Sequence, residues 1–241
     1  MSFQTRAAAC AVASAVLIAP IAAGQSVIAG WSMPTAFPTG AGNVPTGTSY
    51  LPPGPNGAGV ADQGANIAGS QLISVHALAA ATYTSPAGNG SQYSFSSNNW
   101  SPGDYYQVTL STLGFTGGIS ISWDQARSST GPAAFRLLMS TDGGSNFTEL
   151  TSYTVLQSGG GGSPGTWSST TYNALYSNTF TVASAADNLA QVMFRFQNFE
   201  SVASAASGSN RIDNIFVNAI PAPGAVALLG LAGLAARRRR R

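Results

Sequence analysis

Short stretches in which apolar and polar residues alternate recur along most of the chain, and polar or Gly-rich turns separate them. In residues 118–123 (GISISW) and 191–196 (QVMFRF), apolar side chains recur at every second position, as in a half-buried β-strand. No amphipathic helix of useful length is indicated between the two ends of the chain. Such segments bury their apolar face by pairing as strands, so the pattern predicts an all-β body.

The expected strands cover residues 72–78, 105–111, 119–125, 135–141, 147–156, 179–183, 191–199 and 211–217. The turn sequence Asp142-Gly143-Gly144 predicts a hairpin over residues 134–156. Residues 34–69 and 159–165 are rich in Gly and Pro and are expected to be loops. Many short strands with polar turns predict an antiparallel β-sandwich of the jelly-roll type.

The charge of the body, residues 25–219, excludes one class of function. Charged residues make up only 7% of the chain, against roughly 25% in soluble domains. Five of the ten arginines end the chain and Arg6 lies near its start, so the body has four arginines against eight acids and a net charge of −4. A nucleic-acid binder needs a cationic surface to displace counterions from phosphate. We therefore expect no nucleic-acid partner.

The residues of common catalytic and metal sites are scarce. Cys10 is the only cysteine and precedes the body, which excludes thiol catalysis and thiolate-bound zinc. His76 is the only histidine, lies in an expected strand and is predicted to be a structural or surface residue. The sequence therefore predicts a protein that is not an enzyme. A glycosidase pair drawn from the eight acids is the weaker alternative.

Residues 1–24 are predicted to be a signal peptide. Arg6 supplies the positive charge, residues 7–23 are apolar, and Ala22-Ala23-Gly24 offers the small residues that a signal peptidase requires. We expect the secretion machinery to be a partner and the mature chain to begin near Gln25.

The last residues, 220–241, have a different organisation. Pro221-Ala222-Pro223 precedes an apolar segment over 224–236, and Arg237, Arg238, Arg239, Arg240 and Arg241 follow it. As a helix, this apolar segment would rise about 20 Å against a hydrocarbon core of about 30 Å. Arginines after an apolar segment hold that end in the cytoplasm. The segment is therefore predicted to be a short, temporary transmembrane helix, with the body outside the cytoplasmic membrane.

This order of Pro-x-Pro, apolar helix and terminal arginines resembles the PEP-CTERM sorting domain. Ala222 stands where the usual Pro-Glu-Pro has its acid, so the tail is similar to a Pro-Ala-Pro variant. The resemblance covers about the last 22 residues. It implies export by a diderm bacterium, processing by an exosortase-type membrane enzyme, and a final location at the cell surface or outside the cell.

A second resemblance concerns residues 90 to 218. The segments 100–106 (WSPGDYY), 127–132 (RSSTGP), 140–144 (STDGG) and 210–215 (NRIDNI) follow one another as in jelly-roll modules of secreted bacterial proteins, some of them linked to carbohydrate-binding modules. In such modules an acid in the last strand often binds structural calcium. The resemblance implies this role for Asp213, with Asp62, Gln63 and Asn66 as further oxygen ligands. The alternative is an ion pair of Asp213 with Arg127 or Arg211.

Among the aromatic residues, Trp167 and Tyr172 follow the Gly-rich loop and are the candidates for stacking on a glycan, whereas Trp123 is expected in the core. The predicted parts are the signal peptide 1–24, N-terminal strands and a loop over 25–89, the main part of the sandwich over 90–219, and the tail 220–241. The first hypothesis is an exported structural or adhesive protein of the cell surface or extracellular matrix, with exopolysaccharide as a partner. The second is a carbohydrate-binding module, and the third a glycan-active enzyme.

Overall fold

The computed structural model describes residues 26–38, 44–45 and 47–220. The expected signal peptide over 1–24 and the expected sorting residues 221–241 lie outside the described residues. Within the described part, no helix combines the length and the apolar character needed to cross a bilayer.

The described strands form two sheets. The eight-stranded sheet has the order β11-β8-β14-β6-β5-β2, with β1 also paired to β14 and β12 also paired to β8. Its pairs are antiparallel except β11 with β8. Its strands are β1 (Ser26–Trp31), β2 (Val44–Pro45), β5 (Thr82–Thr84), β6 (Phe95–Ser97), β8 (Ile119–Arg127), β11 (Leu156–Gln157), β12 (Ser177–Ala183) and β14 (Asn210–Ala219).

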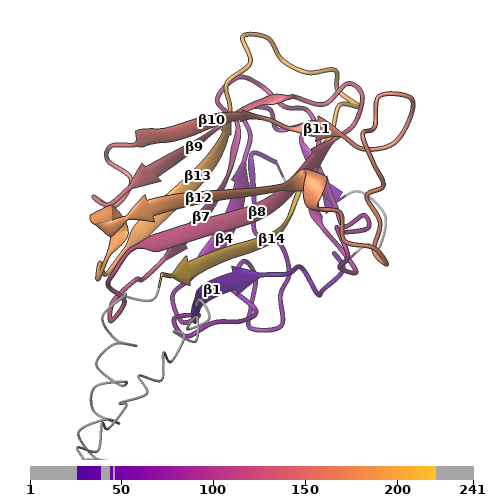
Figure 1. Cartoon of the computed structure of the whole chain (residues 1–241). Helices are drawn as coiled ribbons and strands as arrows, with labels where there is room; N and C mark the ends of the chain where they lie inside the picture. Colours follow the sequence, from indigo (N-terminus) through magenta and orange to yellow (C-terminus); the bar gives the residue numbers. More distant parts are fainter. Residues whose placement is uncertain (1–25, 39–43, 46, 221–241) are drawn as a thin grey trace, which may run out of the picture. The chain divides into compact units, whose positions relative to one another are not determined.

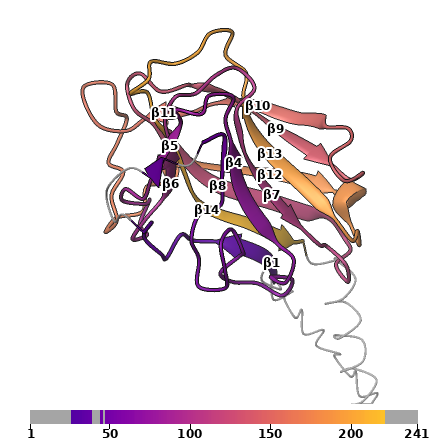
Figure 2. The same ribbon diagram turned by 180° about the vertical axis from the view of Figure 1, so that it is seen from behind.

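The six-stranded sheet has the order β10-β9-β13-β7-β4-β3 and is antiparallel throughout. The view from behind in Figure 2 shows β4, β7, β13, β9 and β10 side by side. Its pairing of β9 with β10 confirms the expected hairpin. Its strands are β3 (Ser49–Tyr50), β4 (Gln71–Val75), β7 (Tyr105–Leu110), β9 (Ala134–Ser140), β10 (Thr148–Thr154) and β13 (Val192–Asn198).

Apolar and aromatic side chains from the inner faces of both sheets form one core. Trp123 of β8 meets Phe196 of β13 with ring centroids 5.0 Å apart, and Phe95 of β6 meets Tyr106 of β7 at 5.3 Å. Trp123 is buried, as expected from the alternation in β8. The predicted all-β sandwich is thereby confirmed. Strands from residues 25–89 also contribute to both sheets, since β1 pairs with β14 and β4 with β7.

The neighbouring strands β8 and β14 both change their outer partners near the paired residues Asp124 and Asp213, and this positions the site described below. On β8, β12 pairs as far as Asp124, and β11 pairs from Ala126. On β14, β6 pairs as far as Ile212, and β1 pairs from Ile215. Between these two changes the pairing of β14 with β8 is interrupted by a bulge after Asp213. Figure 1 shows β12, β8, β14 and β1 lying side by side in this region.

Candidate functional site

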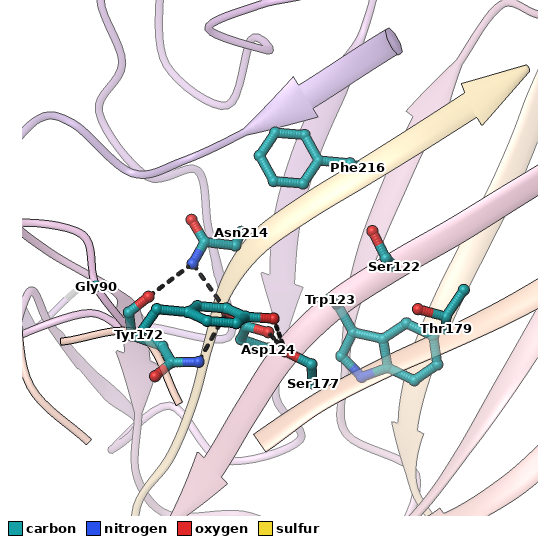
Figure 3. A pocket seen from close by; sticks show the side chains of 10 residues that line it. Gly90, Ser122, Trp123, Asp124, Tyr172, Ser177, Thr179, Asn214 and Phe216 are labelled. Carbon is teal, nitrogen blue, oxygen red and sulfur yellow. Dashed lines mark hydrogen bonds between the residues drawn. The ribbon is translucent and has the colours of Figure 1, made fainter. Parts of the chain in front are cut away.

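The candidate site is a cavity of about 470 Å³ on the outer face of the eight-stranded sheet, where β12, β8 and β14 are neighbours (Figure 3). Its floor follows two rows of paired residues. One row contains Thr179, Ser122 and Phe216, and the next contains Ser177 and Asp124. Strands lie about 4.8 Å apart and side chains on one face recur every ~7 Å, so the floor measures about 10 by 7 Å.

Two loops border this floor. The loop between β5 and β6 brings Asn89 and Gly90, and the segment between β11 and β12 brings Tyr172 and Asn173. The Asn89 amide donates to the Asn173 carbonyl at 3.0 Å, and the Asn173 N–H donates to Asn89 Oδ1 at 2.9 Å. Gly90 has a φ of +74°, and a Cβ there would lie 2.9 Å from Tyr172 Cβ. A glycine therefore allows the two loops to approach this closely.

The carboxylate of Asp124 links the floor to both loops. Its Oδ2 accepts hydrogen bonds from Asn89 Nδ2 at 3.0 Å and Asn214 Nδ2 at 2.8 Å, and its Oδ1 accepts one from Ser177. Ser177 Oγ in turn shares a hydrogen bond of 2.6 Å with the Tyr172 hydroxyl. With 3% of its surface exposed and three donors on its oxygens, Asp124 orients the neighbouring amides and Tyr172.

Asp213 lies opposite Asp124 in the register of β14 and β8, but it is fully buried and does not line the cavity. Its Oδ2 accepts from the Asn89 backbone N–H at 2.8 Å and from Ser91 Oγ at 2.5 Å, while Oδ1 has no partner in the described part of the chain. Burial raises the pKa of Asp213 to about 7, against the opposing effect of these hydrogen bonds.

The expected ion pair of Asp213 with an arginine is not formed. Neither Arg127 nor Arg211 lies within ion-pair distance of Asp213 among the described residues. The alternative interpretation was therefore wrong. The loop residues Asn89 and Ser91 reach the carboxylate instead, because that loop folds over this part of β14.

The calcium hypothesis paired Asp213 with Asp62. Asp62 Oδ2 accepts from the backbone N–H of Ser32 at 2.7 Å and from Ser32 Oγ at 3.0 Å, and Asn66 Nδ2 donates to the Ser111 carbonyl at 3.1 Å. Across residues 26–38, 44–45 and 47–220, no group of three or more His, Cys, Asp or Glu side chains is arranged to hold a metal ion. Calcium binding stays a prediction.

The two predicted stacking residues differ in position. Tyr172 is 58% exposed and lines the cavity. Trp167 is half-buried; its Nε1 donates to the Ala87 carbonyl at 2.7 Å, and its ring packs edge-on against Tyr176. Phe216 and Trp123 also line the cavity, and the sequence did not identify Phe216 as a candidate. The alternation of buried Ile215 and Val217 could have indicated that Phe216 points outward.

Three polar residues lie in the arrangement of a hydrolytic triad elsewhere in the molecule. His76 Nδ1 is 3.0 Å from Asp104 Oδ2, and His76 Nε2 is 3.0 Å from Ser97 Oγ. All three residues are buried, and Ser97 Oγ is also 3.1 Å from the hydroxyl of Tyr106, a core residue. A serine that faces the core cannot reach a substrate, so this cluster is structural. His76, predicted to be a structural or surface residue, is buried in this cluster rather than exposed at the surface.

No protein-family model matches the sequence, and no curated protein matches it. Among solved structures, the chain is similar to the K3 cleaved adhesin domain of Lys-gingipain from Porphyromonas gingivalis, at 18% identity over 56% of this chain and 79% of that chain, with a TM-score of 0.37. The K1 cleaved adhesin domain of the same protein gives 15% identity over 79% and 96%, with a TM-score of 0.36. The N-terminal cellulose-binding domain of β-1,4-glucanase C from Cellulomonas fimi gives 14% over 71% and 87%, with a TM-score of 0.30. At these scores, the function has to be argued from the residues of the chain itself.

Proposed function

We propose that the body is a non-catalytic glycan-binding module of an exported protein. The observation that carries the proposal is the exposed ring of Tyr172 beside a polar floor built on three strands. A sugar ring presents apolar C–H faces and a rim of hydroxyl groups. An exposed aromatic side chain next to hydroxyl and amide groups matches both features.

The polar groups of the cavity are suited to sugar hydroxyls. Ser122 and Thr179 contribute hydroxyls, and Asn214 contributes an amide, from three adjacent strands. The hydroxyls can donate and accept hydrogen bonds, as a sugar hydroxyl does. The Asn214 amide offers its Oδ1 as an acceptor, because its Nδ2 already donates to the Asn89 carbonyl and to Asp124. The hydrogen bond of Asn214 to Asp124 holds this amide in one orientation before a ligand arrives. A site organised in advance loses less side-chain entropy on binding.

The positions of the two acids favour binding over hydrolysis. A glycosidase needs two carboxyl groups on either side of the scissile bond. Asp213 is fully buried and outside the cavity lining, and both oxygens of Asp124 already accept hydrogen bonds from protein donors. If an Asp124→Asn substitution abolished a measurable hydrolysis of any glycan, the non-catalytic part of the proposal would be wrong.

The location is also part of the proposal. The predicted signal peptide and the PEP-CTERM-like tail support export, temporary anchoring, and release to the cell surface or the matrix. N-terminal sequencing of the surface form should start near Gln25, and its intact mass should lack Arg237–Arg241. A surface form that retains Met1 or the five arginines would contradict this processing.

The binding experiment uses the mature protein and a panel of soluble glycans that includes the exopolysaccharide of the producing strain, with and without EDTA. Tyr172→Ala should weaken the affinity for the bound glycan at least tenfold. Phe199→Ala is the matched control, because it removes another exposed aromatic, which follows β13 of the six-stranded sheet. Loss of binding in EDTA would implicate calcium.

If folded wild-type protein binds no glycan, or if the two substitutions have equal effects, the glycan-binding proposal fails. The structural or adhesive hypothesis would then stand, with protein partners as the next candidates.

A further inference from the structure

A second cavity, of about 360 Å³, lies over β5, β6 and the start of β14. Hydroxyl groups dominate its lining, and one charged side chain, Arg211, reaches it. No carboxylate lines it. Arg211 and Asp213 are two residues apart on β14, so they point to the same, outer face as the first cavity. The lining residues with a hydroxyl group are Thr82, Thr84, Ser96, Ser207 and Ser209; Ser97 also lines the cavity, but its hydroxyl faces the core.

Arg211 differs from the other arginines of the described residues. Arg127 donates to three backbone carbonyls. Arg136 donates to Gln197 and forms an ion pair with Glu149, and Arg195 donates to Gln107. These three guanidinium groups are held by protein acceptors.

The guanidinium of Arg211 has no such acceptor in the described part of the chain. The guanidinium lies over the ring of Trp167, whose centroid is 5.8 Å from Cζ. All eight acidic side chains of the sequence are among the described residues, and none is within ion-pair distance of Arg211. None of the acidic side chains of the sequence therefore pairs with Arg211.

The environment of Arg211 makes an unpaired charge unfavourable. Burial lowers the pKa of its guanidinium, although an arginine stays protonated in proteins. Placing a charge away from water without a partner is costly, so a half-buried cation of this kind favours an anionic ligand. A guanidinium binds the paired oxygens of a carboxylate or a sulfate with two parallel hydrogen bonds.

We propose that Arg211 binds the anionic group of an acidic sugar, either a carboxylate or a sulfate ester, so that the ligand of this module is an acidic polysaccharide. This inference rests on the proposed glycan-binding function and specifies its ligand class. The hydroxyl groups around Arg211 would bind the remaining oxygens of that sugar.

The geometry allows one glycan chain to occupy both cavities. Arg211 and Asn214 lie three residues apart on β14, so the two cavities are adjacent along this strand. Trp167 lies close to both cavities: its ring faces Arg211, and its Nε1 bonds to Ala87 in the loop that carries Asn89 and Gly90. The net charge of −4 acts weakly here, because exposed charges are screened beyond about 8 Å at physiological salt.

The test measures the affinity of the mature protein for two matched pairs of polymers: polygalacturonate with its methyl ester, and dextran sulfate with dextran. Arg211→Met keeps the apolar stem and removes the charge. Arg136→Met is the control, because it removes an arginine from the six-stranded sheet. Thermal unfolding checks that both variants are folded, and Arg211→Lys tests whether charge alone is sufficient.

Wild type should bind one acidic polymer at least tenfold more tightly than its neutral partner. Arg211→Met should remove this preference, Arg211→Lys should retain only part of it, and Arg136→Met should keep it. Preference within the first pair identifies a carboxylate, and preference within the second a sulfate. Equal binding of acidic and neutral polymers, or equal effects of the two Met variants, would overturn the inference. If a neutral glycan is still bound through Tyr172 in that case, the proposed function survives without it.

Discussion

Replacing Asp213 by Asn should make the protein lose less stability as the pH rises from about 4 to about 7. Asp213 is fully buried, its Oδ1 lacks a partner among the described residues, and burial raises its pKa to about 7. Asn can accept the hydrogen bonds from Asn89 and Ser91 as the protonated acid does, but it never acquires a charge. The variant therefore mimics the protonated form at every pH.

The magnitude follows from the two pKa values. In the unfolded chain the pKa of Asp213 is 3.8, its ordinary value, and in the folded protein it is about 7. The folded state thus binds the proton more tightly than the unfolded chain. Protonation of Asp213 therefore stabilises the folded protein, and this contribution is fully present below pH 3.8. That stability is lost progressively as the pH rises to about 7. At about 1.4 kcal/mol for each pH unit, the loss amounts to about 4 kcal/mol.

The assay is urea unfolding of both proteins at pH 4.5 and pH 8, in EDTA so that no calcium binds. Asp213→Asn should raise the free energy of unfolding by several kcal/mol more at pH 8 than at pH 4.5. Other titrating groups contribute to both proteins and cancel in this difference. Equal effects of the substitution at the two pH values would refute the reasoning. If added calcium makes the variant the less stable protein at pH 8, the calcium prediction for Asp213 gains support.

Three further substitutions test the packing around the site and the core. Gly90→Ala should lower the free energy of unfolding by about 1–2 kcal/mol because of its positive φ, and it should also weaken glycan binding because the new Cβ would contact Tyr172. Gly69→Ala is the control: its φ of +75° is similar but nothing lies within 4 Å, so it should lower stability without affecting binding. An equal loss of glycan binding in the two variants would contradict the argument. His76→Ala should lower the free energy of unfolding in urea by about 3 kcal/mol, because it leaves a cavity beside Trp100 and removes a hydrogen-bond partner from buried Asp104 and Ser97. A loss below about 1 kcal/mol would show that the cluster contributes little to stability. Phe196→Ala should cost about 3–5 kcal/mol by the same measurement, and an unchanged free energy of unfolding would mean that the two sheets do not share its ring as described.

The long strands could be predicted from sequence because their alternation is local. The expected strands over 105–111, 119–125 and 191–199 correspond to β7, β8 and β13 within two residues at each end. The strands β5 and β6 were missed because each has only three residues, too few to display a period of two. In the described residues of 34–69, a range expected to be a loop, the strands are the two-residue β2 and β3.

The candidate site was predicted only in part. Tyr172 was identified from its place after a Gly-rich loop, but Asn89, Asp124 and Asn214 were not recognised as a group. Asn89 and Asp124 are 35 residues apart, and Asp124 and Asn214 are 90 apart. Nothing in the local sequence of Asn214 indicated its positive φ of 46° or the bulge beside it.

The sequence by itself determined the all-β class, the positions of the long strands, the absence of thiol chemistry in the body and the expectation of export, because composition and periodicity are properties of short segments. Only the tertiary structure decided which polar residues meet. Strands that are distant in the sequence pair with one another in the eight-stranded sheet. Two of them, β8 and β14, change partners at Asp124 and Asp213, and this leaves a gap that two loops border. That non-local pairing also leaves Arg211 without an acidic partner, since the strands and loops around it carry hydroxyl groups rather than carboxylates.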